Sequence, residues 1–146
     1  MVMNQQLSIK KMAHKTSSAI FYEGLNPHEP TISKVSDLIY EWRIYEAYPG
    51  RLEALNERFS KITLKYFEKH GIKVIGFWTA LVGTSNILYY MIAFDDLAHR
   101  ERAWNAFSTD PEWIKVRRET EEKSGGPLTE RIVNMILKPT DYSPLK

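Results

Sequence analysis

The stretch from Val74 to Trp113 constrains the fold more than any other part of the chain. It holds two apolar segments, VIGFWTALV and ILYYMIAF, separated by Gly-Thr-Ser-Asn and followed by DDLAHRERAWNAF. Aromatic and β-branched side chains suit a pleated, packed surface, so the segments predict two long strands joined by a tight turn. The paired aspartates after the second strand predict the start of a helix.

Both faces of the first of these strands carry large apolar side chains. Alternation puts Ile75, Phe77 and Leu81 on one face and Val74, Gly76, Trp78 and Ala80 on the other. A glycine in mid-strand is typical of a bulge, a bend or a close approach by another group. Because helices can cover only one face of a sheet, the second apolar face predicts a homodimer built sheet to sheet.

The flanking segments complete a β-α-β-β-α-β order. They are a strand over Leu38–Glu46, a helix over Arg51–Lys69, a helix from Asp95 or Asp96 to about Phe107, a helix from Asp110 to Lys123, and a strand over Thr129–Lys138. This order predicts an α+β, ferredoxin-like βαββαβ fold with a four-stranded antiparallel sheet. In the first helix, the 3-4-3-4 spacing of apolar residues predicts one buried stripe formed by Leu52, Leu55, Phe59, Ile62 and Tyr66.

Composition limits the classes of function. The net charge of +2, from 20 basic and 18 acidic residues, gives no sign of nucleic-acid binding. The absence of cysteine excludes disulfides, thiolate metal sites and cysteine nucleophiles. No apolar run approaches the roughly 20 residues that span a bilayer, so we expect no membrane span and a cytoplasmic protein.

The N-terminal residues 1–36 differ from the domain expected over residues 37–146. They show no sustained period, and the first 22 residues contain Lys10, Lys11 and Lys15 but no acid, as in a transit peptide. The same residues contain no arginine, which argues against that interpretation. We expect an arm that is flexible or lies on the core.

Several motifs in this sequence resemble the NIPSNAP family. They are YEWRIY followed by Pro49-Gly50, then GFW, Gly83 and Asn86, then FDDLAHRERAW, and finally DPEW. The resemblance covers about residues 37–140. It implies the dimeric α+β barrel superfamily, in which two ferredoxin-like sheets pack face to face. Neighbouring families in that superfamily include cofactor-independent monooxygenases, small isomerases and haem enzymes, so the fold permits an active site without specifying one.

Glu41, Arg43 and Tyr45 form the most suggestive polar group, because alternation puts them on one strand face with about 6.5–7 Å between neighbours. One interpretation is a structural Glu–Arg pair with a tyrosine hydroxyl beside it. The other is the polar end of a ligand pocket, with Arg43 binding an anionic or carbonyl oxygen. Trp78 is either a core residue or an aromatic pocket wall. Tyr90 is a further pocket candidate, and Tyr89 points to the opposite face.

The histidines do not have the spacing of a metal site, and we expect no metal or other cofactor. His70 is the one plausible general base, although a histidine at a helix end is commonly a partner of the helix dipole. His99 as an axial haem ligand is a weaker alternative.

Three functions stay open. The first is a domain of unassigned activity that binds a small, partly aromatic ligand between sheet and helices. The second is a cofactor-independent monooxygenase or isomerase acting on an aromatic or polyketide-like substrate. The third is a protein-association scaffold.

Overall fold

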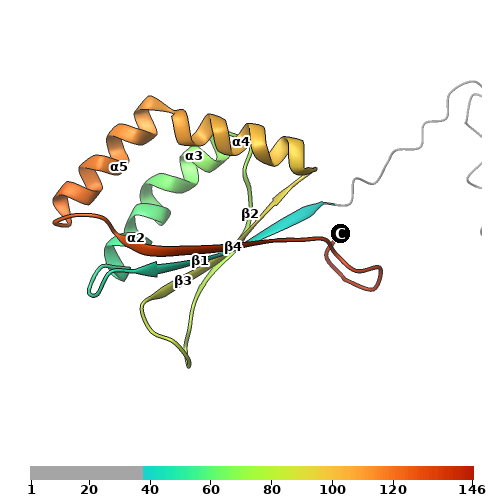
Figure 1. The fold of residues 1–146 in the computed structure, drawn as a ribbon, viewed down its shortest axis with the longest axis horizontal. Coiled ribbons are helices and arrows are strands. Elements are labelled where there is room, and N and C mark those ends of the chain that lie inside the picture. Colours follow the sequence, from blue (N-terminus) through green and yellow to red (C-terminus); the bar gives the residue numbers. More distant parts are fainter. Residues whose placement is uncertain (1–37) are drawn as a thin grey trace, which may run out of the picture. The chain divides into compact units, whose positions relative to one another are not determined.

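The computed structural model describes residues 38–146, and the predicted arm over residues 1–36 lies outside them. The elements, in chain order, are β1 (Ile39–Ala47), α2 (Leu52–Arg58), η1 (Phe59–Thr63), α3 (Leu64–Lys69), β2 (Lys73–Thr79), β3 (Ile87–Phe94), α4 (Leu97–Thr109), α5 (Pro111–Lys123) and β4 (Thr129–Leu137). The strands form one antiparallel sheet in the order β2-β3-β1-β4 (Figure 1). The predicted α+β, ferredoxin-like βαββαβ fold is therefore confirmed.

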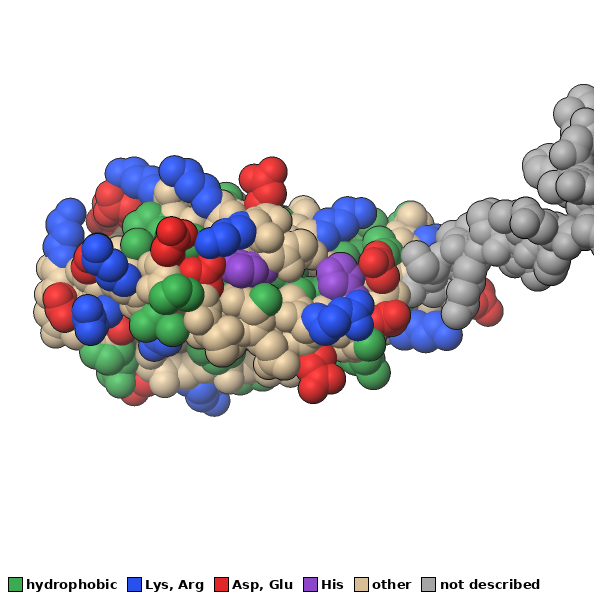
Figure 2. Space-filling model, turned by 90° about the horizontal axis from the view of Figure 1, so that it is seen from above, with side chains coloured by type: hydrophobic (Ala, Val, Ile, Leu, Met, Phe, Trp, Pro, Cys, Tyr) green, Lys and Arg blue, Asp and Glu red, His purple; other side chains and the backbone are tan. Residues whose placement is uncertain are grey.

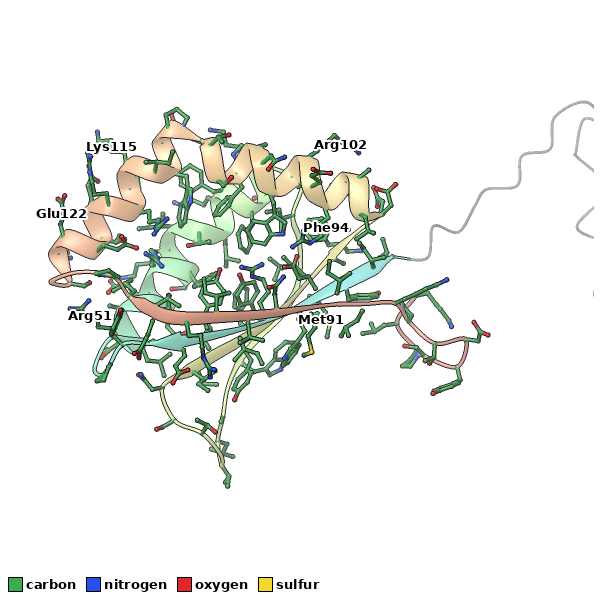
Figure 3. The ribbon with its side chains drawn as sticks, viewed as in Figure 1. Arg51, Met91, Phe94, Arg102, Lys115 and Glu122 are labelled. Atoms are coloured by element: carbon green, nitrogen blue, oxygen red, sulfur yellow. The ribbon has the colours of Figure 1, made fainter. Side chains whose placement is uncertain are left out.

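All the helices lie on one face of the sheet, and the core fills the space between (Figures 1 and 3). The centre of this core is aromatic: Tyr90 in β3 packs against Phe59, Phe67 and Phe77. In β1, Glu41, Arg43 and Tyr45 share the helix-facing side with Tyr90, because Arg43 is paired with Tyr90 in the register. Glu41, Arg43 and Tyr45 therefore share one face, as the alternation predicts.

A bulge in β2 corrects the predicted faces of that strand. The register with β3 shifts between Val74 and Gly76, so Ile75 is an extra residue. Val74 consequently packs against the core together with Phe77, and its assignment to the face of Trp78 was wrong. Gly76 does lie on the face of Trp78, and a Cβ atom there would come within 2.8 Å of the indole ring.

The connection between β2 and β3 is longer than the predicted turn. β2 ends at Thr79, and residues 80–86 form a loop that extends from the sheet on the side away from the helices (Figure 1). Leu81, predicted to be in the strand, lies in this loop and is 98% exposed. Positive φ angles at Gly83 and Asn86 bend the backbone out of strand geometry over a wider span than four residues.

The first helix is continuous from α2 to α3 but contains a π-helical turn, η1. This turn holds one residue more than an α-helical turn and rotates the buried stripe. The buried side chains at its end and in α3 are Thr63 and Phe67, whereas Ile62 and Tyr66, predicted for the stripe, are only partly buried. The stripe prediction therefore holds for Leu55 and Phe59, whereas Leu52 is only partly buried and the later positions are shifted by one residue.

The open face of the sheet is apolar. Trp42 of β1 stacks on Trp78 and Tyr89 there, and Met91 lies on the same side (Figure 3). On the edge strand β4, three apolar side chains of this face are at least 39% exposed: Val133, Met135 and Leu137. Within the described part of the chain, no helix is both long and apolar enough to cross a membrane.

Asp110 links the end of α3 to the start of α5. It is the N-cap of α5, at the predicted start of that helix, and accepts hydrogen bonds from the backbone N–H groups of Glu112 and Trp113. Its other oxygen lies 2.7 Å from His70 Nε2 and 2.9 Å from Lys69 Nζ, at the end of α3. The hydrogen bonds from Lys69 and His70 hold the pKa of Asp110 below its usual range.

Because the folded-state pKa is lowered, the stabilisation by Asp110 is complete above the unfolded-state pKa of about 4 and is lost as the pH falls. Replacing Asp110→Asn keeps a good N-cap but removes the charge. We expect a lower free energy of unfolding at pH 7, with a smaller difference from the native protein at pH 3. Urea denaturation at both pH values tests this, with Asp141→Asn in the exposed C-terminal tail as control. An equal difference at both pH values would contradict the role of the charge.

Candidate functional site

A buried carboxylate lies between the sheet and α4. Glu41 is fully buried and accepts a bidentate pair of hydrogen bonds from Arg100, at 2.8 and 3.0 Å. Trp104 Nε1 and Asn134 Nδ2 donate at 2.9 and 3.0 Å, and Arg43 Nη1 lies 2.5 Å away. Burial opposes ionisation, but the hydrogen bonds from Arg100 and Trp104 and the charges of both arginines outweigh it, so the pKa of Glu41 lies below its usual value.

Arg43 is held by the same group of residues. One end of its guanidinium donates to Glu41, the other donates to the Tyr45 hydroxyl at 3.1 Å, and Cζ lies 4.5 Å from the centroid of the Trp104 ring. This geometry is that of a structural Glu–Arg pair with a tyrosine hydroxyl beside it. The neighbouring Tyr90 hydroxyl is buried without a partner among the described residues, and burial raises its pKa.

The residues around Glu41 form a polar cluster, which consists of Glu41, Arg43, Tyr45, Tyr90, Arg100, Trp104 and Asn134. A cavity of about 410 Å³ opens beside the polar cluster, between the helices and β4. Its inner wall is aromatic and consists of Tyr45, Phe59, Phe67, Trp104, Phe107 and Trp113. Its mouth is formed by exposed side chains, among them Ser108 and Ile114 on the helices and Ile132 on β4. The cavity thus combines an apolar interior with an opening to solvent, as ligand sites usually do.

A buried arginine provides the polar end of the cavity. Arg58 is only 7% exposed, and its Nη1 donates to Glu121 Oε1 at 3.2 Å. Glu121 also pairs with Arg117 at 3.0 Å. Burial lowers the pKa of Arg58, although the ion pair with Glu121 opposes that effect. Arg58 Nε and Thr129 Oγ1, both on lining residues, are buried and have no partner among the described residues.

The π turn contributes to this arrangement. It begins directly after Arg58, and the Thr63 hydroxyl donates to the Arg58 carbonyl at 3.3 Å, five residues back. Through it Arg58, Phe59, Thr63 and Phe67 all line the cavity from one helix. π turns occur frequently at functional sites for this reason, since they rotate side chains without breaking the helix.

The sequence-predicted candidates divide between three places. Tyr45 lines the cavity, while Glu41, Arg43 and Tyr90 lie in the polar cluster beneath it. Trp78 lies on the open face of the sheet, 46% exposed, away from this group. A role for any of them in ligand binding stays a prediction.

The two histidines within residues 38–146, His70 and His99, lie outside the cavity lining. His70 faces Asp110 across the helix junction, and His99 Nδ1 lies 3.2 Å from Asp95 at the start of α4. Among residues 38–146, no group of three or more histidine, aspartate and glutamate side chains could hold a metal ion. On the helix-covered face, acidic and basic side chains are interspersed (Figure 2).

Sequence reasoning missed Arg58, Thr129 and most of the aromatic wall as site residues. Arg58 looked like a surface residue because a regular helix would place it off the apolar stripe. One signal was available: Leu55, Phe59, Thr63 and Phe67 follow one another at intervals of four residues.

The polar cluster yields a test of stability. We expect Glu41→Gln to lower the free energy of unfolding by about 3–5 kcal/mol, because it leaves Arg43 buried without an anion. Arg43→Met should cost about 2 kcal/mol, since Glu41 keeps its bidentate partner Arg100. The double variant should lose less than the sum of the two. Urea denaturation measures all three.

Glu46→Gln, on the same strand, is the matched control, because its pair with Arg131 is exposed and should contribute less than about 1 kcal/mol. A loss for Glu41→Gln no larger than that of the control would show that the cluster does not stabilise the fold.

Comparisons with known proteins give the family. The NIPSNAP family model matches residues 40–144. No curated protein matches the chain. In solved structures, an uncharacterized NIPSNAP-like domain protein from Burkholderia xenovorans shares 26% identity with a TM-score of 0.66, and 75% of this chain and 90% of that chain are covered.

Two further structures resemble the chain in fold. A NIPSNAP family protein with unknown function from Agrobacterium tumefaciens is 23% identical, over 77% of this chain and 96% of that one, with a TM-score of 0.67. SnoaB, a cofactor-independent oxygenase from Streptomyces nogalater, is 11% identical over 74% of this chain and 98% of that one, with a TM-score of 0.50. Since the family match spans most of the sequence, the chain belongs to the NIPSNAP family.

Proposed function

We propose that this NIPSNAP domain binds a small, partly aromatic molecule in the cavity between sheet and helices, and that it does so as a homodimer joined through the open sheet face. The cavity carries the proposal: it is about 410 Å³, walled by aromatic rings, and contains a buried arginine. Small-molecule sites typically have volumes of about 300–1,000 Å³ and a few polar groups in an apolar lining.

The lining favours recognition of a flat, apolar body. Phe107 and Trp113 lie with ring centroids 4.6 Å apart, and Phe107 also contacts Phe67 and Trp104 in edge-to-face geometry. Such rings prefer offset or edge contacts with another ring, which a planar ligand can supply. Among the described residues that line the cavity, Glu121 is the one carboxylate, and it pairs with two arginines. We therefore propose binding as the function.

The homodimer rests on the open face. Trp78, Val133 and Met135 are partly exposed there, and with Trp42 and Tyr89 they make a continuous apolar surface over all four strands. Large apolar patches of this kind mark interfaces in soluble proteins. A second copy presents the same surface, so a two-fold axis would bring the two faces together.

Blocking the cavity tests ligand binding. We expect Ser108→Phe, at the cavity mouth, to abolish the fluorescence increase of the neutral dye N-phenyl-1-naphthylamine that the native protein produces. Asn105→Phe, on the same helix but outside the lining, is the control and should leave it unchanged. Equal dye binding by native protein and Ser108→Phe, or no binding by either, would contradict the proposal.

Charge on the open face tests the dimer. We expect light scattering to give twice the chain mass for the native protein at micromolar concentration and the single mass for Met135→Glu. A buried glutamate without a partner is unfavourable in an apolar interface. Lys115→Glu, on α5 and pointing to solvent (Figure 3), should remain dimeric. A monomeric native protein would overturn the assembly without affecting the cavity.

A further inference from the structure

Two buried polar atoms in the cavity lining lack a hydrogen-bond partner within residues 38–146. They are Arg58 Nε, from the first helix, and Thr129 Oγ1, from the beginning of β4. The guanidinium Nε–H can only donate, and the threonine hydroxyl can donate or accept. Buried groups of this kind are paired in most proteins, so unpaired ones at a cavity indicate that a partner is supplied from outside.

The charges around the cavity define that partner further. In the part of the chain that the structure describes, three guanidinium groups line the cavity, those of Arg58, Arg117 and Arg118, against the single carboxylate of Glu121. Glu121 already receives hydrogen bonds from Arg58 Nη1 and Arg117 Nε. Arg118 pairs at 3.7 Å with Glu122, which is not a lining residue. The lining therefore carries excess positive charge, and a ligand with an anionic oxygen acceptor complements it.

Glu121 also positions the arginine. It accepts from Nη1 and so leaves Nε–H out of the ion pair, and Arg58 Cζ lies 6.0 Å from the centroid of the Trp113 ring. The aromatic wall continues from Trp113 to Phe107 and Phe59. A polar anchor and a ring-binding wall thus meet in one cavity.

We propose that the cavity takes a planar aromatic carboxylic acid, whose carboxylate accepts from Arg58 Nε–H and the Thr129 hydroxyl while its ring lies against Phe107 and Trp113. This inference rests on the proposed ligand-binding function and names the ligand class. Both anchoring atoms are buried, so the proposal includes a rotation of the Arg58 side chain that brings Nε–H to the carboxylate while Nη1 stays with Glu121.

Two near-isosteric probes separate the charge from the ring. 2-Naphthoate and its neutral amide, 2-naphthamide, are titrated into the full-length protein, and the indole N–H signals of Trp104 and Trp113 are followed by NMR, because both rings line the cavity. We expect 2-naphthoate to bind at least about tenfold more tightly than the amide, as one hydrogen-bonded charge pair allows.

Variants assign the anchor. Arg58→Gln should reduce the affinity for 2-naphthoate about tenfold and leave that for 2-naphthamide almost unchanged. Thr129→Val, which is nearly isosteric and uncharged, should weaken 2-naphthoate about threefold to tenfold, and it decides the matter if Arg58→Gln does not fold. Arg102→Gln removes an exposed positive charge on α4 (Figure 3) and should leave both affinities as in the native protein.

The outcomes are distinct. Equal affinities of the two probes, with the indole signals shifting and no effect of Thr129→Val, would overturn the carboxylate anchor but leave ligand binding in place. No shift of the indole signals with either probe, together with no dye binding, would remove the proposed function itself. If Arg102→Gln weakened 2-naphthoate binding as much as Thr129→Val does, the preference for the carboxylate would come from the overall positive charge of the protein. That result would also overturn the anchor.

Discussion

The buried carboxylate of Glu41 is the interaction on which the rest of the domain depends. A carboxylate without access to water is tolerated only where its lone pairs are all used, and here donors come from β1 itself, from β4 and twice from α4. The requirement fixes the distance between α4 and the sheet as well as the register of β4. Because α4 is held in this way, α5 follows at a set position through the Asp110 cap, and the cavity lies beneath both helices.

The fold was predictable because its signals are local. Alternation put Glu41, Arg43 and Tyr45 on one face of β1, and Asp110-Pro111 marked the start of α5, since a cap and a fixed φ act within one turn of the helix. Predictions failed where one extra residue interrupts the regular alternation of a strand or the regular turn of a helix. The extra residue Ile75 in β2 moved Val74 to the other face, and the π turn moved the buried position from Tyr66 to Phe67.

The candidate site was less predictable, because its contacts join distant parts of the chain. Glu41 and Arg43 could be recognised as a pair from their spacing on one strand. Their partner Arg100 is 59 residues from Glu41, and Asn134 is 93 residues away, so neither could be assigned from spacing. Arg58 was missed because it is a charged residue at the end of α2, and the glutamate that holds it, Glu121 of α5, is 63 residues away. The family resemblance gave the fold of such a domain but no residue of the cavity.

The strand order has a consequence for the way the chain reaches this structure. β1 lies between β3 and β4, and Tyr40 near its start is paired with Leu137 near the end of the chain. The β2–β3 hairpin can form from neighbouring residues, but β1 acquires its second neighbour only when the last strand is available. During synthesis, one edge of the central strand therefore stays unpaired until almost the whole domain has left the ribosome. Docking of β4 is then the step that closes the sheet, delivers Asn134 to the carboxylate and completes the wall of the cavity.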